Sequence, residues 1–110
     1  MIRNFTLNCF FIFSLQFAYC QSNHEWLQFD ALYGEAGYDK FGKSVAINNS
    51  GNIMAIGGDY NDGNGTSAGH VRVFQRINTS WVQMGSDIDG ENSYDYSGGS
   101  IDINSQGNRI

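Results

Sequence analysis

Apolar and polar positions alternate along this chain in short runs, and glycine-rich stretches separate the runs. No run is long enough to indicate a helix, and the runs are enriched in β-branched and aromatic residues, which favour strands. Bends marked by glycine between such runs are typical of short strands joined by turns. The pattern therefore predicts an all-β fold, with strands at 24–30, 44–48, 53–57, 70–76 and 80–84.

The run at 53–57 differs from the others because it is apolar on both faces. Ile53 and Ala55 point to one side of an extended chain, whereas Met54 and Ile56 point to the other. A strand that is apolar on both faces lies between two layers. We therefore expect the sheet to be covered on both sides.

The connections between the predicted strands alternate in length. A tight hairpin at 49–52, in which Gly51 and Asn52 tolerate positive φ, and a short turn at 77–79 alternate with long links at 34–43, 58–69 and 88–99. Successive connections of an antiparallel meander lie at opposite ends of the sheet. The long links should therefore share one end, and the tight turns should share the other.

The chain also repeats itself. Trp26 and Gln28 return 55 positions later as Trp81 and Gln83. A second set returns 56 positions later and ends close to the last residue of the sequence: Gly34, Glu35, Tyr38, Asp39, Gly42, Ser44, Ile47, Asn48, Gly51 and Asn52 match Gly90, Glu91, Tyr94, Asp95, Gly98, Ser100, Ile103, Asn104, Gly107 and Asn108. A period near fifty residues indicates units that bury their apolar faces against one another. With sheets covered on both faces, it predicts a partial β-propeller of about one and a half four-stranded antiparallel blades.

Residues 1–20 resemble a secretory signal peptide, because they hold one basic residue, Arg3, no acid and an apolar stretch. Ala18 and Cys20 are the small residues expected before a cleavage site, which predicts a mature protein that begins at Gln21. An uncleaved apolar N-terminus and lipidation of Cys20 are the alternatives, although Tyr19 is bulky for a lipidation motif. We expect a secreted or cell-surface protein that does not insert into the membrane after cleavage.

The charge balance argues against one class of partner. The chain has 6 Lys and Arg residues against 11 Asp and Glu residues, a net charge of −5, and its basic residues do not cluster. Binding to a phosphate backbone needs a basic patch. We therefore expect no nucleic-acid partner.

Two segments carry a family resemblance. Phe41-Gly42-Lys43-Ser44-Val45, followed by Ile-Met-Ala-Ile-Gly-Gly at 53–58, resembles the FG-GAP type of repeat, the blade unit of integrin-α-like β-propellers and of secreted bacterial surface proteins. The runs at 61–65 and 69–74 are similar to a subgroup found in tandem in large bacterial surface proteins. The resemblance implies an outer strand and loop of a first, incomplete repeat at 21–40, a complete blade repeat at 41–96, and the truncated start of the next repeat at 97–110.

The resemblance does not extend to the calcium loop of spaced aspartates that integrin-type repeats commonly carry. The corresponding turns at 48–52 and 104–108 contain no carboxylate, and hard cations prefer several oxygen ligands that include carboxylates. The segment 59–65 fails as an EF-hand loop, because Asn64 stands where glycine is required. It leaves open an irregular calcium site using Asp59 and Asp62, or a loop whose side chains bond their own backbone. We expect no cofactor.

Catalytic signals are weak. Glu35 with Asp39 and Glu91 with Asp95 offer paired carboxylates, but a catalytic site is normally a single event, whereas residues kept in every repeat usually serve the blade. We expect these residues to bond loop backbone between neighbouring blades. His24 and His70 are predicted strand-end residues without metal-ligand spacing, and the sequence has no nucleophile elbow or phosphate loop. The chain is predicted not to be an enzyme.

The predicted function is that of a non-catalytic exported module for binding or adhesion, within a larger β-propeller that contains further repeats of the same chain. Its long loops would contact an extracellular protein or glycan, because loops on a rigid scaffold commonly carry binding. Tyr60, flanked by Asp59, Asn61 and Asp62, is the predicted contact, since its ring offers stacking area beside polar groups. The alternatives are an accessory propeller domain of an extracellular hydrolase and a structural spacer.

Overall fold

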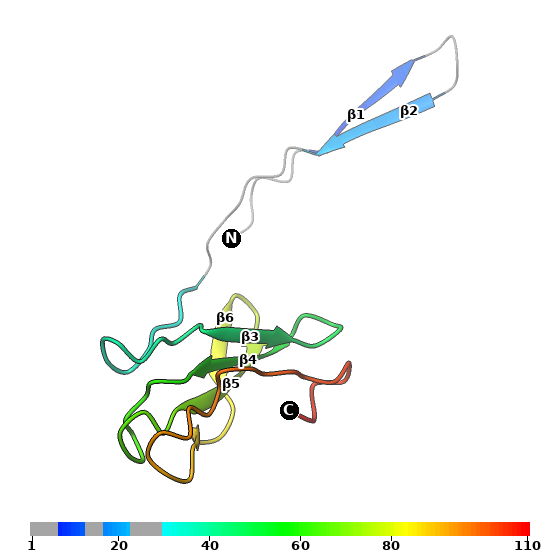
Figure 1. Cartoon of the computed structure of the whole chain (residues 1–110). Coiled ribbons are helices and arrows are strands. Elements are labelled where there is room, and N and C mark those ends of the chain that lie inside the picture. Colours follow the sequence, from blue (N-terminus) through cyan, green and yellow to red (C-terminus); the bar gives the residue numbers. More distant parts are fainter. Residues whose placement is uncertain (1–6, 13–16, 23–29) are drawn as a thin grey trace.

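The computed structural model describes residues 7–12, 17–22 and 30–110, and this part of the chain is all-β (Figure 1). The seven strands are β1 (Leu7–Ile12), β2 (Phe17–Ser22), β3 (Ser44–Ile47), β4 (Ile53–Gly58), β5 (His70–Ile77), β6 (Ser80–Gln83) and β7 (Ile88–Asp89). The described ranges contain no helix that could cross a membrane.

Strands β1 and β2 form an antiparallel hairpin in which Leu7 lies opposite Ser22 and Ile12 lies opposite Phe17. Within the described part of the chain, these two strands pair only with each other. The predicted leader at 1–20 includes all of β1 and part of β2, and its cleavage after Cys20 stays a prediction. The run expected at 24–30 falls outside the described residues, apart from Asp30.

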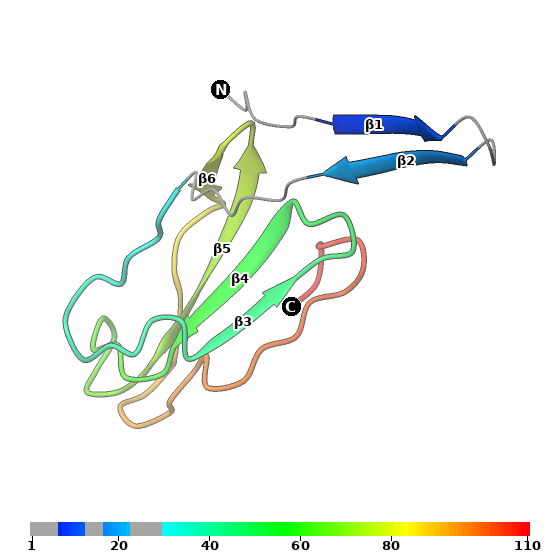
Figure 2. The same cartoon turned by 90° about the horizontal axis from the view of Figure 1, so that it is seen from above.

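The main sheet runs in chain order from β3 to β6, with every pair antiparallel, and β7 also pairs with β5 (Figure 2). The four strands predicted between residues 44 and 84 are confirmed to within one residue at each end. β7 was not predicted, because its two residues lie within an expected long link.

β6 and β7 occupy successive stretches of the same edge of β5, since β4 pairs with the other edge. Between the pairs Gln83–Phe74 and Val71–Ile88, the outer chain has four residues, at 84–87, where β5 has two. Gly85 lies in this excess with a φ of +71°, a conformation that glycine adopts without strain. The sheet thus has four strand positions, and the outermost is interrupted by a bulge.

The core lies around β4, as the two-sided apolar pattern predicted. Ile53 and Ala55 are buried on one face and Ile56 on the other, while Met54 on that second face is partly exposed. β5 adds Val71 and Phe74 to the buried set. The apolar pattern of the sequence thus predicted correctly that β4 buries apolar side chains on both faces. Burial of apolar area stabilises the fold.

Residues 97–108, which belong to the second copy, cover the face of β4 that carries Ile53 and Ala55. The Ser44 hydroxyl donates to the Gly98 carbonyl at 2.7 Å, and the Asn49 amide donates to the Ser105 carbonyl at 3.1 Å. A Cβ atom on Gly57 would lie only 2.1 Å from the Gly98 carbonyl oxygen. Glycine at these positions therefore allows backbone to lie directly on the sheet.

The second copy does not form the strand that its match to Ser44–Ile47 would suggest, since residues 100–103 are not in a strand and pair with none in the described part of the chain. In the first copy, β3 pairs with β4 alone among the described strands. The counterpart of β4 would begin at Arg109, so the described residues supply no ladder partner for 100–103. A strand needs that partner to satisfy its backbone groups.

The repeat is nevertheless visible in the backbone. The Asn48 carboxamide oxygen accepts from the amides of residues 52 and 53, and the Asn104 oxygen accepts from those of residues 108 and 109. Four matched pairs have positive φ: Tyr38 (71°) and Tyr94 (66°), Lys40 (55°) and Tyr96 (52°), Gly42 (93°) and Gly98 (86°), Gly51 (69°) and Gly107 (77°). The repeat inferred from the sequence is thus confirmed as a structural one.

The three long links, at 34–43, 58–69 and 88–99, lie together at one end of the sheet, which we call the long-loop end (Figure 2). The Tyr60 amide donates to the Asp39 carbonyl at 3.2 Å, and the Tyr94 amide donates to the Thr66 carbonyl at 2.8 Å. These bonds join the first link to the second and the second to the third. The end assignment made from strand order is therefore confirmed.

Candidate functional site

His70 is the centre of a polar cluster at the long-loop end. It is the first residue of β5, it pairs with Gly58 of β4, and its side chain is fully buried. A Cβ atom on Gly58 would lie 3.2 Å from Nε2 of His70, so glycine makes room for the ring. The Phe41 ring packs edge-on against the imidazole, with 6.0 Å between centroids.

Asp87 reaches His70 because of the bulge in the outer strand. Its Oδ2 lies 3.4 Å from Nδ1 of His70. Arg72, two residues further along β5 on the same face, donates from Nε to Oδ1 at 2.9 Å and from Nη2 to Oδ2 at 2.8 Å. Gln83 donates to the same carboxylate at 2.6 Å. β-Bulges often change the direction of a side chain near a functional site.

The charges in this cluster act on each other. The hydrogen bonds from Arg72 hold the pKa of the Asp87 carboxyl at about 2, against the opposing effect of its burial, and Gln83 adds to the lowering. The same pairing raises the pKa of Arg72 above its ordinary value. Hydrogen bonding and an opposite charge both favour the ionised carboxylate, so Asp87 is a carboxylate near neutral pH.

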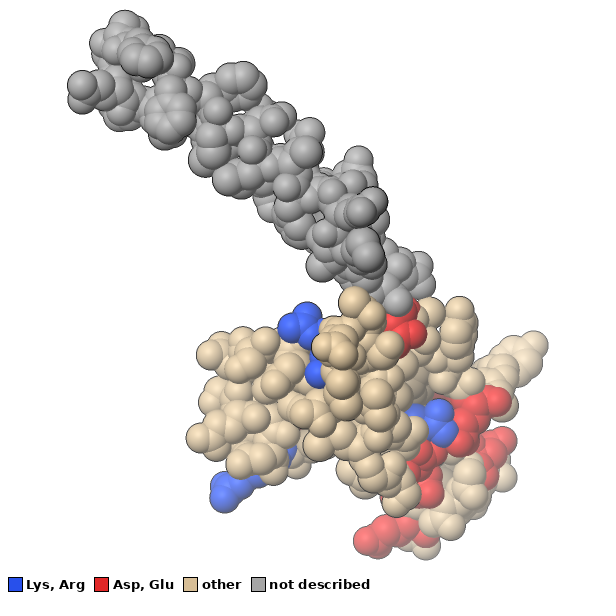
Figure 3. All heavy atoms as spheres, turned by 180° about the vertical axis from the view of Figure 1, so that it is seen from behind, with Lys and Arg blue, Asp and Glu red and all other residues tan. Residues whose placement is uncertain are grey.

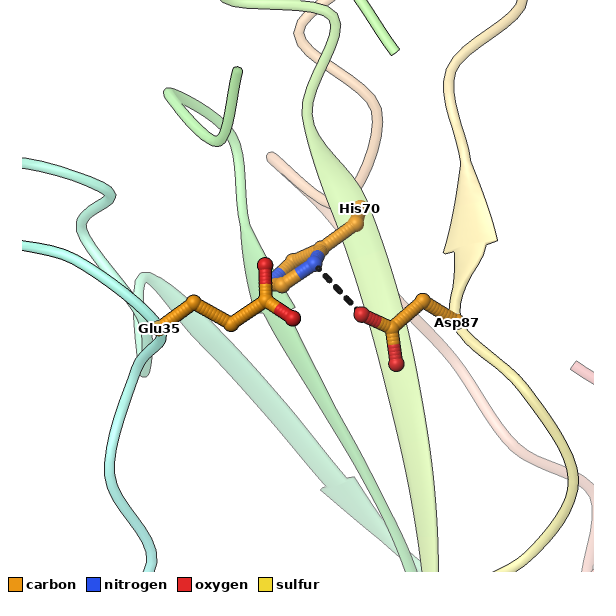
Figure 4. Close-up of side chains that lie close together, drawn as sticks. All are labelled: Glu35, His70 and Asp87. Atoms are coloured by element: carbon orange, nitrogen blue, oxygen red, sulfur yellow. Dashed lines mark ion pairs between the residues drawn. The ribbon is translucent and has the colours of Figure 1, made fainter. Parts of the chain in front are cut away.

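Glu35 brings a second carboxylate from the first long link. It accepts from Nη2 of Arg72 and from the carboxamide of Asn61, the latter at 3.1 Å. Three possible ligand atoms, one from each of Glu35, His70 and Asp87, lie within 4.8 Å of one another (Figure 4). The three residues come from separate segments and face one point in the structure.

The prediction that His70 lies at a strand end is confirmed, whereas sequence spacing gave no indication of the residues that surround it. Two carboxylates that are distant in sequence lie close to the imidazole. Both ring nitrogens are buried without a hydrogen-bond partner among the described residues. Leaving a buried polar group unpaired costs about 1–3 kcal/mol, so the ring is held in an unfavourable setting.

The predicted contact residues 59–62 divide into two kinds. Tyr60 is 39% exposed and Asp62 is exposed, whereas Asp59 and Asn61 are buried. Asn61 accepts from the Gly63 amide at 2.9 Å, and Asp62 accepts from the Ser67 amide at 2.7 Å. For these two side chains, the interpretation as a loop that bonds its own backbone is confirmed. Among the described residues, Asp59 and Asp62 do not belong to a group with metal-ligand geometry.

Tyr60 belongs to a cluster of exposed aromatic rings. Its ring centroid lies 5.4 Å from that of Tyr96, which lies 6.4 Å from that of Tyr94. Lys40 places its ammonium 3.6 Å above the Tyr60 ring. The tyrosines are 39%, 42% and 63% exposed for Tyr60, Tyr96 and Tyr94. We call these three rings with Lys40 the tyrosine cluster; it includes residues of all three long links.

The aspartates that recur in the two copies, Asp39 and Asp95, accept hydrogen bonds from backbone within their own loops. Oδ2 of Asp39 accepts from the Ala36 amide at 3.2 Å, and Oδ2 of Asp95 accepts from the Asn92 amide at 2.8 Å. The expectation that the recurring acids bond loop backbone is confirmed for Asp39 and Asp95, although these bonds lie within one link and not between neighbouring blades. Glu35 accepts from side chains instead. Each aspartate carboxylate closes a turn within its own link, because the acceptor is only three residues from the donor.

Comparison with known proteins identifies the repeat. Residues 33–74 match the family model described as the FG-GAP repeat. The match covers the first long link, β3, β4 and β5 through Phe74. No curated protein and no solved structure matches the chain. The chain therefore contains an FG-GAP-type repeat, and the resemblance seen in the sequence is confirmed.

The Asp87 ion pair predicts a pH dependence of stability. The pKa of Asp87 in the folded protein, about 2, lies below the model-compound value of 3.8. Its contribution is therefore complete above about pH 4 and is lost as the pH falls toward 2. We expect Asp87→Asn to lower the free energy of unfolding by about 1–2 kcal/mol at pH 7, since hydrogen bonds to charged groups are lost.

Urea unfolding at a series of pH values measures this effect. Relative to the unmodified protein, Asp87→Asn should show a smaller decline in stability between pH 4 and pH 2. Asp102→Asn is the control, because Asp102 is exposed and, among the described residues, accepts only from the amide of its neighbour Ile103. Equal effects of the two substitutions would contradict a stabilising role for the Asp87 pairing.

Proposed function

We propose that this protein is a non-catalytic, exported binding module, that it forms part of a larger β-propeller, and that its long-loop end contacts an extracellular protein or glycan. The observation that carries the proposal is the tyrosine cluster. Three long links meet on a paired sheet, and they expose neighbouring aromatic rings at the same end. Binding residues are commonly found on loops held by a rigid scaffold.

The propeller part of the proposal is supported by how the second copy lies on the first. Residues 97–108 cover the face of β4 that carries Ile53, whereas the outer part of that face is open. Val82 pairs with Gln75 of β5 and Ile88 pairs with Val71 of β5, so both lie on this face. Their exposed fractions are 47% for Val82 and 51% for Ile88. Stacked blades bury such faces against one another. Strands that continue the second copy would cover these two residues.

The chemistry of the tyrosine cluster suits a polar ligand with flat apolar patches, such as a sugar. Tyrosine combines ring area with a hydroxyl group, and Lys40 adds a cation above one ring. Asp62 is exposed in the same link as Tyr60. Stacking and hydrogen bonding are therefore available together.

We expect Tyr60→Ala to weaken binding about ten-fold or more while changing the melting temperature little, because the ring is partly exposed and packs mainly on other surface rings. The probe is an array of immobilised oligosaccharides and extracellular-matrix proteins, followed by titration of the strongest hit. Asn49→Ala, at the opposite end of the sheet, should change neither quantity.

Three outcomes would contradict the proposal. A Tyr60→Ala protein that loses stability but keeps its binding would place the contact elsewhere. No binding to any immobilised sugar or protein would favour the structural spacer. Cleavage of a bound oligosaccharide by the unmodified chain would show that it is an enzyme.

A further inference from the structure

We propose that Glu35, His70 and Asp87 form a binding site for a zinc ion at the long-loop end. The site is separate from the tyrosine cluster, and its existence does not depend on the binding function proposed above.

The donor set is one that zinc accepts. Zinc is bound in proteins by imidazole nitrogen and carboxylate oxygen, often by three side chains with a water in the fourth position. Calcium and magnesium instead prefer oxygen ligands throughout. Glu35 is 45% exposed at its side chain, so water can reach the site from that side. The cluster thus offers three protein ligands and one open position.

The spacing fits a tetrahedral ion. Two ligand atoms about 2.1 Å from a zinc ion, at the tetrahedral angle, lie about 3.4 Å apart. Nδ1 of His70 and Oδ2 of Asp87 are separated by 3.4 Å, which is long for a hydrogen bond. The Glu35 oxygen lies within 4.8 Å of both atoms, and its side chain is the exposed one that can adjust.

The buried imidazole is an independent indication. His70 is 0% exposed, and neither of its ring nitrogens has a hydrogen-bond partner among the residues that the structure describes. In Figure 4, the edge of the ring that carries Nδ1 faces the Asp87 carboxylate, and the Glu35 carboxylate lies beside it. A metal ion bound to Nδ1 would remove part of the cost of burying this ring.

Arg72 supports the carboxylates and also limits the affinity. Each carboxylate oxygen has two lone pairs, so Oδ2 of Asp87 can accept from Arg72 and still coordinate a metal. Hydrogen bonds from outer residues commonly orient metal-binding carboxylates. The two carboxylates and the guanidinium sum to a formal charge of −1, which attracts a dication less than two free carboxylates would. We therefore expect moderate affinity, in the micromolar range.

The wider surface favours cations. In Figure 3, Asp and Glu side chains gather over the long-loop end, whereas Lys and Arg side chains appear as separate spots. A region of one sign of charge raises the local concentration of the opposite ion and the rate at which it arrives.

The test is calorimetric titration of the full chain with zinc chloride, with cobalt absorption as a second readout. Cys9→Ser and Cys20→Ser are included throughout, because thiolates also bind zinc. We expect one zinc per chain, a visible spectrum of tetrahedral cobalt that zinc abolishes, and weaker binding of calcium. Glu35→Gln should weaken zinc binding at least ten-fold and remove the cobalt spectrum.

The matched control is Glu91→Gln. Glu91 is the exposed repeat counterpart of Glu35 in the second copy, and within the described part of the chain it belongs to no metal-ligand group. This substitution should leave zinc affinity unchanged within two-fold. His70→Gln should abolish zinc binding, and circular dichroism checks that this variant is folded. If the His70→Gln variant unfolds, the result for Glu35→Gln decides whether the site exists. Equal affinities for Glu35→Gln and Glu91→Gln, or no zinc binding below millimolar concentration, would overturn the site.

Discussion

Replacing Gly98 by alanine is expected to lower the free energy of unfolding by about 3 kcal/mol. Gly98 has a φ of +86°, and an added Cβ atom would lie 2.3 Å from the His70 carbonyl oxygen and 3.0 Å from Cα of Gly57. A left-handed conformation costs an ordinary residue about 1–2 kcal/mol, and overpacking costs about 1–3 kcal/mol more. Urea unfolding followed by tryptophan fluorescence measures the loss.

Gly42→Ala separates these two contributions. Gly42 is the repeat counterpart of Gly98, with a φ of +93°, but an added Cβ atom there would meet nothing within 4 Å. It should therefore cost only about 1 kcal/mol, from backbone strain alone. Equal losses for the two substitutions would contradict the packing of residues 97–108 on the sheet.

Asn48→Ala is expected to cost about 2–3 kcal/mol. Asn48 is buried, and its carboxamide oxygen accepts from the amides of Asn52 and Ile53, each at 3.0 Å, while its amide nitrogen donates to Asn52 at 2.8 Å. Alanine would leave both amides of the β3–β4 turn without this acceptor, and each unpaired group is costly where it is buried. Thermal and urea unfolding measure the change.

Asn104→Ala is the internal control for this turn. Asn104 makes the same bonds to residues 108 and 109, but in an exposed setting where water can replace them. Its loss should cost about 0.5 kcal/mol or less. If Asn104→Ala is as destabilising as Asn48→Ala, burial is not what makes the first turn important.

The features of this protein that depend on local chemistry could be predicted from its amino-acid sequence. The strands between residues 44 and 84 follow from alternation and β-branched residues, and the tight turn follows from Gly51, which has a positive φ, whereas Asn52, the other residue named for this turn, does not. The repeat could be detected in the sequence because equivalent residues make equivalent local hydrogen bonds in the two copies, as Asp39 and Asp95 do. The placement of the long links at one end followed from strand order alone.

The tertiary structure decided which distant residues meet. Nothing beside His70 in the sequence indicates that Glu35 and Asp87 reach it, because that proximity needs the first long link to fold over β5 and a bulge to turn Asp87 inward. Tyr60 was predicted as a contact, but its neighbours Tyr94 and Tyr96 belong to the second copy and join it only through loop packing.

Residues 100–103 show the same difference between local pattern and tertiary pairing. Their pattern matches β3, yet they pair with no strand in the described part of the chain. Side-chain alternation selects residues that suit a strand, but a ladder forms only where a second chain segment offers its donors and acceptors. Local sequence therefore determined the repeating unit, whereas pairing and packing between distant segments determined its edges, its buried histidine and its exposed tyrosine cluster.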